Sequence, residues 1–468
     1  MERVARRVLP AKSRARGDHH SPVKTVLTVG GLDPSNGAGI TKDIEIFTAM
    51  GLHGVAVPTS IVVQGPKGVE SVSPVHPEVF SAMLLRARED FVLSGIKLGA
   101  LTDASYVDRV GEFLAARKGI PVVLDPVMAA KNGHVLITDE GLEAMGKHLF
   151  HLATCLTPNL EEAQLLLNEP IENRKAMEGA AKRLCRMGPA SVLLKGGHLA
   201  GEPIDVLFDG RKVLARRKER IGKTVHGTGC MLSAAFLAFL ALGYSLAEAF
   251  LEAEQAMEKI IGISSRPAEN GYFYGCPGVE AARDADRWRV LQAMHTAAAR
   301  LVDLNMVELI PAVQMNVGYA IRGGMSPDDV AAFPGRIGLH LGKVLIKGAP
   351  EFGASSHVAR LCLACMRRFP HLRAAANIRY DEAVLEKAHK SGLSVLFADR
   401  KREPEGWKSE EGKSLDFIVD MALSQAGGPP DIIYDHGDVG KEPIIRLFAR
   451  DPEELIGKME IIRSCKTS

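Results

Sequence analysis

The sequence predicts an α/β protein, in which a larger domain with a mostly parallel sheet covered by helices precedes a second, smaller α/β domain. The length predicts more than one domain, because 468 residues exceed the usual size of a single one. From Val23, short β-branched runs alternate with longer segments of helical spacing, which indicates a parallel sheet with helices on both faces. This alternation stops at residues 265–288 and then resumes. The expected parts are a disordered basic tail (1–22), a first domain (23–275), a linker (276–288) and a second domain (289–468).

The same pattern predicts the individual elements. Expected strands of the first domain are 23–30, 54–63, 95–101, 121–127, 153–157 and 191–196, and its expected helices are 41–50, 77–91, 104–118, 139–150, 160–168 and 174–187. In the second domain, strands are expected near 307–309, 343–347, 394–398 and 431–434, and helices at 289–303, 355–369, 380–391 and 413–425.

The composition is typical of a soluble globular protein. Hydrophobic residues make up 46% of the chain and charged residues 24%, and the net charge of +2 suggests neither a nucleic-acid nor a membrane partner. The seven cysteines are scattered and no signal peptide is recognisable, so a reduced, cytoplasmic protein is expected. The arginine-rich tail leaves organelle targeting open beside a solvated extension.

One apolar run, residues 230–251, approaches the length of a membrane span. Gly243 and Ser245 interrupt the run, and Glu248 and Glu252 follow at once. We therefore expect a buried helix pair in place of a span.

Residues 224–235 carry the strongest single signal for function. They place Gly227, Thr228 and Gly229 in a turn directly before the long apolar helix. Glycine amides at a helix N-terminus can surround an oxyanion, so this turn suits the charge that develops on a transferring phosphoryl group. Cys230 follows, where a catalytic side chain would face that group. Taken alone, an ordinary tight loop before a helix explains the turn as well.

Four further residues near strand ends are consistent with phosphoryl transfer, because ligands of parallel sheets bind beyond the carboxyl ends of the strands. Asn159 and Glu162 can jointly organise hydrated Mg²⁺, although a helix cap with a solvated carboxylate is the simpler interpretation. Lys195 can neutralise phosphate charge. Asp125 precedes a proline and can orient the metal or the phosphate groups, unless it only initiates a turn.

Asp33 and Gln64 are the candidate substrate-binding residues. Asp33 lies in the glycine-rich segment 30–39 and can accept hydrogen bonds from an amine or a hydroxyl group. Gln64, at a strand end, offers a donor and an acceptor together, which fits the edge of an aminopyrimidine.

These motifs resemble the hydroxymethylpyrimidine and phosphomethylpyrimidine kinases of thiamine biosynthesis, in the ribokinase-like superfamily. Residues 23–275 match in seven blocks, in order GGLDPSNGAGI, VVQ, KLGAL, LDPVM, TPNLEEA, LLKGGH and HGTGCMLSAA. The resemblance implies two phosphorylations at one site with ATP and Mg²⁺, and Cys230 at the position where most ribokinase-like enzymes carry an aspartate base. A thiol at a helix N-terminus is expected to have a lowered pKa, which would favour a thiolate base.

Two departures from this family affect the pocket. Ala100 stands where bacterial relatives often carry methionine, and the segment after GAGI lacks the glutamine that is common there. Pyridoxal kinase, a close relative with the same phosphate machinery, is the alternative. Kinases of this family usually pair through their sheets, so a homodimer or a higher homo-oligomer acting on small molecules is expected.

Three segments of the second domain carry candidate anion-binding residues. Arg336 lies in PGRI, and His357 follows two serines that are good helix caps, although a capped helix with a partly exposed histidine is the simpler interpretation. Lys441 belongs to segment 434–443, which fits a phosphate or Mg²⁺ loop and a plain turn equally. In segment 367–380 we expect the arginines to solvate a helix, with Arg379 as a possible anion contact.

Cys362 and Cys365 form a Cys-x-x-Cys pair within an apolar helical pattern. A zinc or redox role would need partner residues that the sequence does not show, so we expect both thiols to be buried.

The second half resembles the thiamine-phosphate synthase domain that archaea and some bacteria fuse behind the pyrimidine kinase. The matching segments are PGRIGLH, PEFGASSHVAR, AANIRY and YDHGDVGKEP, and the family's functional arginine and histidine fall on Arg336 and His357. The resemblance implies coupling of hydroxymethylpyrimidine diphosphate to hydroxyethylthiazole phosphate with release of pyrophosphate, whose charge Arg336, His357 and Lys441 would neutralise. The alternative is a thiamine-phosphate-sensing regulatory domain. Both functional residues are kept and no helix-turn-helix is recognisable, which argues against it.

Overall fold

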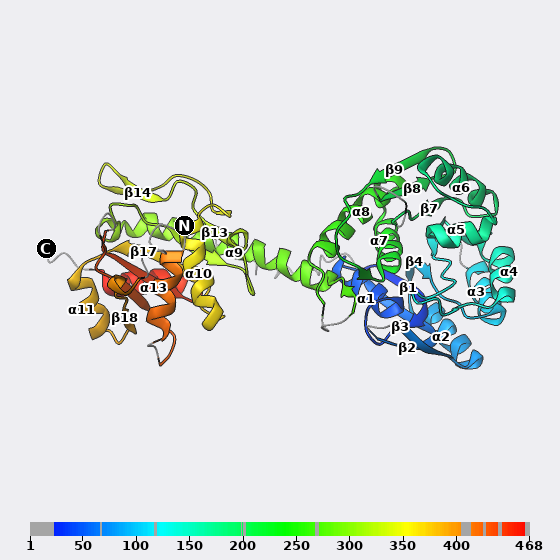
Figure 1. Ribbon diagram of the computed structural model, residues 1–468, viewed down its shortest axis with the longest axis horizontal. Helices are drawn as coiled ribbons and strands as arrows, with labels where there is room; N and C mark the ends of the chain where they lie inside the picture. The colour runs from blue at the N-terminus through cyan, green and yellow to red at the C-terminus, as the bar shows by residue number, and fades with distance from the viewer. Residues whose placement is uncertain are drawn as a thin grey trace, which may run out of the picture. The chain divides into compact units, whose positions relative to one another are not determined.

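The chain divides into two units, Met1–Glu280 and Ala281–Ser468. The computed structural model describes residues 23–65, 68–116, 119–197, 199, 203–266, 271–403, 413–424, 427–438 and 442–463 (Figure 1). The expected tail at 1–22 and the candidate Lys441 lie outside the described residues.

Nine strands form the main sheet of the first unit: β1 (Thr25–Leu32), β2 (His53–Gly65), β3 (Gly68–Pro74), β4 (Leu93–Leu98), β5 (Val122–Leu124), β6 (Cys155–Leu156), β7 (Val192–Leu194), β8 (Ile204–Phe208) and β9 (Val213–Arg217). Their order is β3-β2-β1-β4-β5-β6-β7-β8-β9. Neighbours from β2 through β7 run parallel, whereas β3, β8 and β9 are antiparallel to their neighbours. The mostly parallel sheet predicted from the sequence is thus confirmed.

Sequence reasoning missed the antiparallel strands at the two edges. The edge strands β3 and β9 consist mainly of exposed or partly exposed residues, so they lack the continuous apolar run that marks a parallel strand. A second, two-stranded parallel sheet, formed by β10 (Val225–His226) and β11 (Phe273–Tyr274), was also missed, because strands of two residues leave no periodicity to read.

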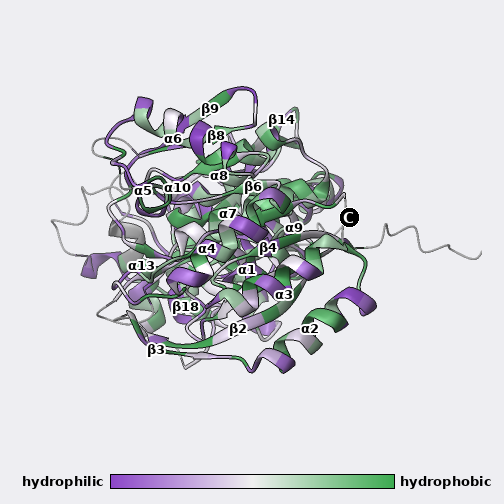
Figure 2. Ribbon diagram, turned by 90° about the vertical axis from the view of Figure 1, so that its right-hand side faces the viewer, coloured by the Kyte–Doolittle hydropathy of each residue, from purple (hydrophilic) through white to green (hydrophobic). Residues whose placement is uncertain are grey.

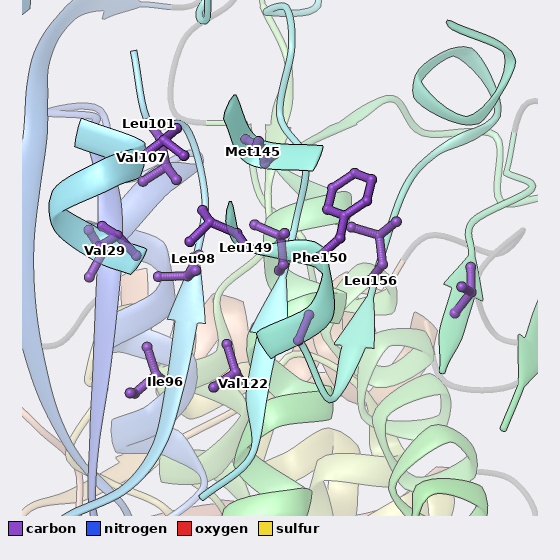
Figure 3. Close-up of a cluster of buried hydrophobic side chains, with 14 of the residues drawn as sticks. Val29, Ile96, Leu98, Leu101, Val107, Val122, Met145, Leu149, Phe150 and Leu156 are labelled. Atoms are coloured by element: carbon purple, nitrogen blue, oxygen red, sulfur yellow. The ribbon is translucent and has the colours of Figure 1, made fainter. Parts of the chain in front are cut away.

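Helices cover both faces of the main sheet. They are α1 (Gly39–Ala49), α2 (Pro77–Asp90), α3 (Ala104–Ala115), α4 (Asp139–His148), α5 (Leu160–Leu167), α6 (Arg174–Arg186), α7 (Thr228–Leu242) and α8 (Leu246–Gly262), with a 3₁₀ turn η1 (Phe150–Leu152). One face packs against α2 to α6, where Leu98 of β4 and Leu156 of β6 lie near Leu149 and Phe150 (Figure 3). The other face packs against α1, α7 and α8. Polar and apolar residues share helix α2, as expected of a helix that buries one stripe (Figure 2).

The long apolar run forms the predicted buried helix pair. Helix α7 ends where Gly243 adopts a left-handed φ of 107°, and Ser245 begins α8 with a capping box to Glu248. Within the part of the chain that the structure describes, no helix has both the length and the apolar character needed to cross a bilayer.

The second unit contains a seven-stranded sheet. Its strands are β12 (Val317–Ala320), β13 (Val330–Ala332), β16 (Glu351–Phe352), β17 (Ala374–Arg379), β18 (Val395–Phe397), β19 (Ile432–Asp435) and β20 (Ile444–Ala449), in the order β16-β13-β12-β17-β20-β19-β18. Its helices are α9 (Pro277–Leu304), α10 (Ser356–Arg368), α11 (Glu382–Lys390), α13 (Lys413–Ser424) and α14 (Pro452–Ile462), with 3₁₀ turns η2 (Val307–Leu309), η3 (Pro327–Asp329) and η4 (Arg400–Arg402). Helices α9, α11 and α14 contribute to one hydrophobic core, and α10 and α13 to the other.

One predicted strand of this unit is wrong, and several observed strands were not predicted. The strand expected near 307–309 is the 3₁₀ turn η2. The strand expected near 343–347 is confirmed as β15 (Lys343–Ile346), and it pairs with β14 (Ile337–His340) in a separate hairpin. Residues 374–379, which lie between the helices expected at 355–369 and 380–391 and were not predicted as a strand, form β17 in the middle of the sheet. An alanine-rich strand such as AAANIR is hard to recognise from sequence, because alanine has the highest helix propensity. Here burial of the strand on both faces of the sheet overrides that preference.

The segment expected as a linker is helical. Helix α9 begins at Pro277, and a proline that suggests a turn also fits the first turn of a helix. Arg283 donates a 2.6 Å hydrogen bond to Asp329, and Asp286 accepts one of 3.1 Å from Arg373. Residues after 280 therefore pack as part of the second unit.

Candidate active sites

The carboxyl edge of the first sheet gathers several of the predicted site residues. Asp125 and Lys195 directly follow β5 and β7, and Asn159 comes three residues after the end of β6, the strand between them. The Lys195 ammonium lies 2.7 Å from Asp125 Oδ1, and both side chains are buried. The amide of Lys195 donates to the carbonyl of Pro158. A charged pair thus lies at the edge where ligands of parallel sheets bind.

The N-terminus of α7 lies beside this pair. Gly227 precedes the helix with a left-handed φ of 73°, and the first amide to bond within the helix is that of Met231, to the Gly227 carbonyl. The amides of the three residues between them therefore precede the intrahelical ladder. A Cβ atom built on Gly229 would lie 3.2 Å from Lys195 Nζ. An anion held by these amides would also meet the lysine ammonium.

Two glycine-rich loops pack backbone against backbone at this helix end. A Cβ atom on Gly227 would lie 1.9 Å from the carbonyl oxygen of Gly37, and one on Gly37 would lie 2.1 Å from Cδ2 of His226. These separations leave no room for a side chain at either position.

Gly227→Ala is therefore expected to destabilise the first unit and to abolish phosphoryl transfer. Gly51→Ala is the matched control, because Gly51 has a similar φ of 78° but an added Cβ would meet nothing within 4 Å. Gly51→Ala should lose only about 1–2 kcal/mol, the cost of a residue with a Cβ atom in the left-handed conformation. Calorimetry should show a larger fall in Tm for Gly227→Ala, and ATP consumption should survive only in the control. Equal effects would show that the close approach of the two loops is unimportant.

Asp33 holds the glycine-rich loop that contains it. Its Oδ1 accepts from the amide and hydroxyl of Ser35 at 2.8 and 2.7 Å, and its Oδ2 accepts from the amides of Gly37 and Ala38 at 3.1 and 2.8 Å. Burial alone would raise the pKa of Asp33, but these bonds and nearby His226 lower it below its ordinary value. The four bonds fill the lone-pair positions of a carboxylate, so the predicted substrate contact would require one of them to break.

Cys230 lies among charged side chains from four elements: Lys97 on β4, Asp43 on α1, Asp125 after β5 and Lys195 after β7. Burial raises the pKa of the Cys230 thiol to about 11; nearby Lys97 opposes this rise, and the two carboxylates add to it. The lowered pKa predicted from the helix N-terminus is therefore wrong for this structure. Burial in the protein and the two nearby carboxylates raise the pKa of Cys230 by more than the positive end of the helix lowers it.

Lys97 and Asp43 form a buried ion pair within this group. The Lys97 ammonium lies 2.8 Å from Asp43 Oδ2, which also accepts a 2.6 Å bond from the hydroxyl of Thr28. The other carboxylate oxygen of Asp43 is buried without a hydrogen-bond partner. The pair thus leaves one acceptor free in the group around Cys230.

Asn159 and Glu162 form a complete capping box at the start of α5. The Asn159 side chain accepts from the Glu162 amide, and Glu162 Oε2 accepts from the Asn159 amide, both at 2.8 Å. The helix-cap interpretation is thus confirmed, but the carboxylate is buried and not solvated. Burial raises the pKa of Glu162 to about 7, with Lys195 opposing the rise.

Gln64 lies near the end of β2, opposite Val69 of β3 and next to a register shift. It is partly buried. No hydrogen bond within the described residues connects Gln64 with Asp33 or with the group around Cys230, so its contact with a substrate stays a prediction.

In the second unit, β19 and β20 bring buried charges together. Arg446 Nη1 lies 2.7 Å from Asp435 Oδ2, and Arg400 Nε lies 2.8 Å from Asp435 Oδ1, which also accepts from the amide of Gly437. Asp435 and Arg446 are at most 1% exposed. The Asp435 carboxylate of segment 434–443 thus binds two arginines, which argues against a Mg²⁺ loop at Asp435.

His357 lies in the first turn of α10, after Ser355, which occupies the cap position without a side-chain cap bond. The predicted serine cap is therefore wrong for Ser355. Part of the His357 residue is exposed, yet the surrounding protein and the positive charges of nearby arginines lower the pKa of His357 to about 4. The arginines, in decreasing order of effect, are Arg446, Arg336, Arg400 and Arg360.

Arg336 has a left-handed φ of 62°, directly after Gly335 with a φ of 72°. Its Nη1 donates a 2.5 Å bond to the carbonyl of Val313. The structure thus brings the two predicted residues Arg336 and His357 into one positively charged group.

Comparisons with known proteins cover both units. A profile of phosphomethylpyrimidine kinase matches residues 33–272, and one of thiamine-phosphate synthase ThiN matches residues 293–461. The bifunctional thiamine biosynthesis protein ThiDN of Methanocaldococcus jannaschii is 32% identical over 439 residues, which cover 94% of this chain and 98% of that protein. The chain belongs to the family of bifunctional thiamine biosynthesis proteins.

Two further proteins are similar to the first unit. The hydroxymethylpyrimidine/phosphomethylpyrimidine kinase of Aquifex aeolicus is 38% identical over 214 residues, which cover 45% of this chain and 84% of that protein. A solved structure of the pyridoxal kinase from Staphylococcus aureus in complex with ADP is 30% identical, with a TM-score of 0.52 over 56% of this chain and 95% of that chain. The predicted ribokinase-like fold is thus confirmed, and the protein is an enzyme with a kinase and a synthase domain.

Sequence reasoning missed several charged or polar residues that the structure places at these two sites of the thiamine biosynthesis protein. They are Lys97 and Ser233 in the first unit and Arg360, Arg400, Asp435 and Arg446 in the second. A signal existed for two of them, because Lys97 and Arg446 each interrupt an otherwise apolar strand run. A charged residue within a strand buried on both faces needs a partner, which is a reason to look for a site.

Proposed function

We propose that the first unit phosphorylates hydroxymethylpyrimidine and then its monophosphate with ATP, and that the second unit couples the resulting diphosphate to hydroxyethylthiazole phosphate, giving thiamine phosphate and pyrophosphate. The observation that carries the proposal is the relative named for bifunctional thiamine biosynthesis, which matches both units over nearly their whole length. A charged site in each unit supports it: the pair of Lys195 and Asp125 in the first and the arginines around His357 in the second.

In the kinase unit, the amides at the N-terminus of α7 and the Lys195 ammonium would hold the transferring phosphoryl group. Asp125 binds the Lys195 ammonium at 2.7 Å and accepts a 3.0 Å hydrogen bond from Ser233 of α7. These two contacts fix the position of the ammonium group relative to the N-terminus of α7. Preorganised donors of this kind stabilise the charge that develops during phosphoryl transfer. Cys230, next along α7, would take the proton of the substrate hydroxyl group in its thiolate form, which is a minor form at neutral pH because the pKa of the thiol is about 11.

The donor set fits Mg²⁺ bound largely through phosphate oxygens and water. Mg²⁺ is typically held in proteins by one or two carboxylates, and Glu162 and Asp125 provide two near Lys195. The described residues contain no cluster of three or more potential metal-ligating side chains, which agrees with a site that needs the nucleotide phosphates. The ion would neutralise phosphate charge there.

In the synthase unit, Arg336 and His357 would bind the diphosphate that leaves as the C–O bond breaks. Charge-assisted hydrogen bonds from guanidinium groups suit this leaving group. The expected homo-oligomer and cytoplasmic location belong to this proposal as well; the six cysteines within the described residues are free, as in a reduced compartment.

One coupled assay tests the whole proposal. The protein receives ATP, Mg²⁺, hydroxymethylpyrimidine and hydroxyethylthiazole phosphate, and thiamine phosphate is measured by its fluorescent oxidation product. Product formation is expected. Accumulation of the pyrimidine diphosphate without thiamine phosphate would support the sensor alternative for the second unit, and no ATP consumption would overturn the kinase assignment.

Pyridoxal is the second candidate substrate, because solved structures of pyridoxal kinases match the first unit, including one bound to pyridoxal. Competition between pyridoxal and hydroxymethylpyrimidine at equal concentration separates the two. We expect the pyrimidine to have the higher kcat/KM, and turnover of pyridoxal alone would contradict the proposal.

A further inference from the structure

We propose that Arg360, Arg400 and Arg446 complete, with Arg336 and His357, a diphosphate-binding site in the second unit, and that His357 takes up a proton when this site fills. The inference rests on the synthase function proposed above, because it names the group that would occupy that site.

Positive charge exceeds negative charge around His357. Four arginines approach it from four elements: Arg336 before β14, Arg360 on α10, Arg400 on η4 and Arg446 on β20. Among the described residues, Asp435, which Arg400 and Arg446 share, and Glu403, which lies 3.9 Å from Arg400, supply carboxylates to this group. Such an excess of guanidinium groups attracts a multiply charged anion.

Two of these arginines have no acidic partner among the residues that the structure describes. Arg336 donates to the carbonyl of Val313, and Arg360 is partly exposed on α10 near the imidazole of His357. Guanidinium groups that are not paired with a carboxylate can form the bidentate bonds that phosphate groups prefer.

Arg446 supplies an independent sign of a ligand. Its side chain is almost fully buried, and although Nη1 binds Asp435, its Nε is buried without a hydrogen-bond partner. Buried donors are almost always paired in native proteins, because an unpaired one has lost its hydrogen bonds to water without gaining others. An incoming phosphate oxygen would supply an acceptor that this group lacks.

The state of His357 follows from the same charges. With the four arginines around it the pKa of His357 is about 4, so the ring is neutral near pH 7. A bound diphosphate would place several negative charges beside the ring and favour the protonated form. The bound imidazolium then has a proton to give to the bridging oxygen of the leaving diphosphate, which receives the electron pair of the breaking C–O bond. His357 would return to its neutral form as pyrophosphate forms.

Titration of the full-length protein with inorganic pyrophosphate tests the inference. Isothermal calorimetry at pH 6.5 in two buffers of different protonation enthalpy measures the protons taken up on binding. We expect an uptake of about one proton, the full change from neutral to protonated imidazole. His357→Gln should remove that uptake. Because the first unit has its own candidate phosphate site, only the difference between parent and variant counts.

Variants of the arginines test the site itself. Arg360→Met and Arg446→Met should each weaken this pyrophosphate binding at least about tenfold, the loss expected for one charge-assisted contact. Arg450→Met is the matched control, because Arg450 follows β20 directly, is exposed and pairs with Glu454. If Arg446→Met does not fold, as judged by its Tm, the partly exposed Arg360 still decides the question. Pyrophosphate binding by Arg360→Met as tight as by Arg450→Met, or unchanged proton uptake by His357→Gln, would overturn the inference.

Thiamine phosphate formation is measured on the same samples. Turnover without His357-dependent proton uptake would overturn the inference and leave the synthase function standing. Binding with proton uptake but without turnover would support the anion site and contradict the synthase function.

Discussion

Cys230→Ala is expected to lower the kcat of the kinase by about 10²–10⁴-fold, the usual contribution of a general base. The thiol follows the phosphate-binding amides of α7 directly, and Lys97, Asp43, Asp125 and Lys195 surround it. The measurement is ADP formation with hydroxymethylpyrimidine under saturating ATP. Thiamine phosphate formation from supplied pyrimidine diphosphate should not change, because that step belongs to the other unit.

Cys185→Ala is the control for this substitution, since Cys185 is a partly exposed thiol on α6 of the same unit. A near-normal rate for Cys230→Ala would mean that the substrate phosphate or the amides at the helix end suffice. An independent test is the rate at which iodoacetamide labels Cys230, followed by mass spectrometry. With the pKa of Cys230 near 11, labelling should be slow at pH 7 and should accelerate about tenfold per pH unit up to pH 9. Rapid, pH-independent labelling would contradict the raised pKa.

Replacing Arg336 or His357 is expected to lower synthase activity by at least about 10²–10³-fold, the loss seen when one preorganised stabiliser of a developing charge is removed. Both residues belong to the positively charged group that would neutralise the leaving diphosphate. The measurement is thiamine phosphate formation from supplied diphosphate and thiazole phosphate, with ADP formation by the kinase unit recorded in parallel and expected to stay constant.

Two variants keep this second experiment interpretable. Arg336→Gly removes the guanidinium group while suiting the left-handed φ of 62°, so it should not destabilise the loop. His340→Ala, in the neighbouring hairpin strand β14, removes an exposed histidine and should leave synthase activity intact. Loss of kinase and synthase activity together would indicate misfolding, and full synthase activity in Arg336→Gly would remove that residue from the mechanism.

Much of the kinase site could be predicted because the carboxyl ends of parallel strands lie at the same edge of the sheet. Asp125, Asn159 and Lys195 were found from strand ends alone, since the strand rhythm of the first unit is regular. What the sequence could not give was how the polar groups pair. Asp33 points its oxygens at its own loop, and the pKa of Cys230 depends on carboxylates that come from other elements of the unit.

The synthase unit was harder to predict because its sheet is mostly antiparallel and its strands are short. The central strand β17, which is rich in alanine, and β20, which carries Arg446, were both missed. The charged group around His357 therefore assembles from elements whose order in the sheet no local pattern reveals. Motif resemblance found Arg336 and His357, but the residues that set the charge state of His357 emerged only from the fold.

Helix α9 determines how the two enzymes could be separated for study. Its residues beyond 280 hold Asp329 and Arg373 of the synthase unit through Arg283 and Asp286, and Arg287 lies 3.8 Å above the ring of Phe352. A recombinant synthase fragment that began at residue 289 would therefore lose three side-chain anchors and start in the middle of a helix. Fragments meant to report on either activity alone should divide the chain before Pro277, so that the whole of α9 travels with the second enzyme.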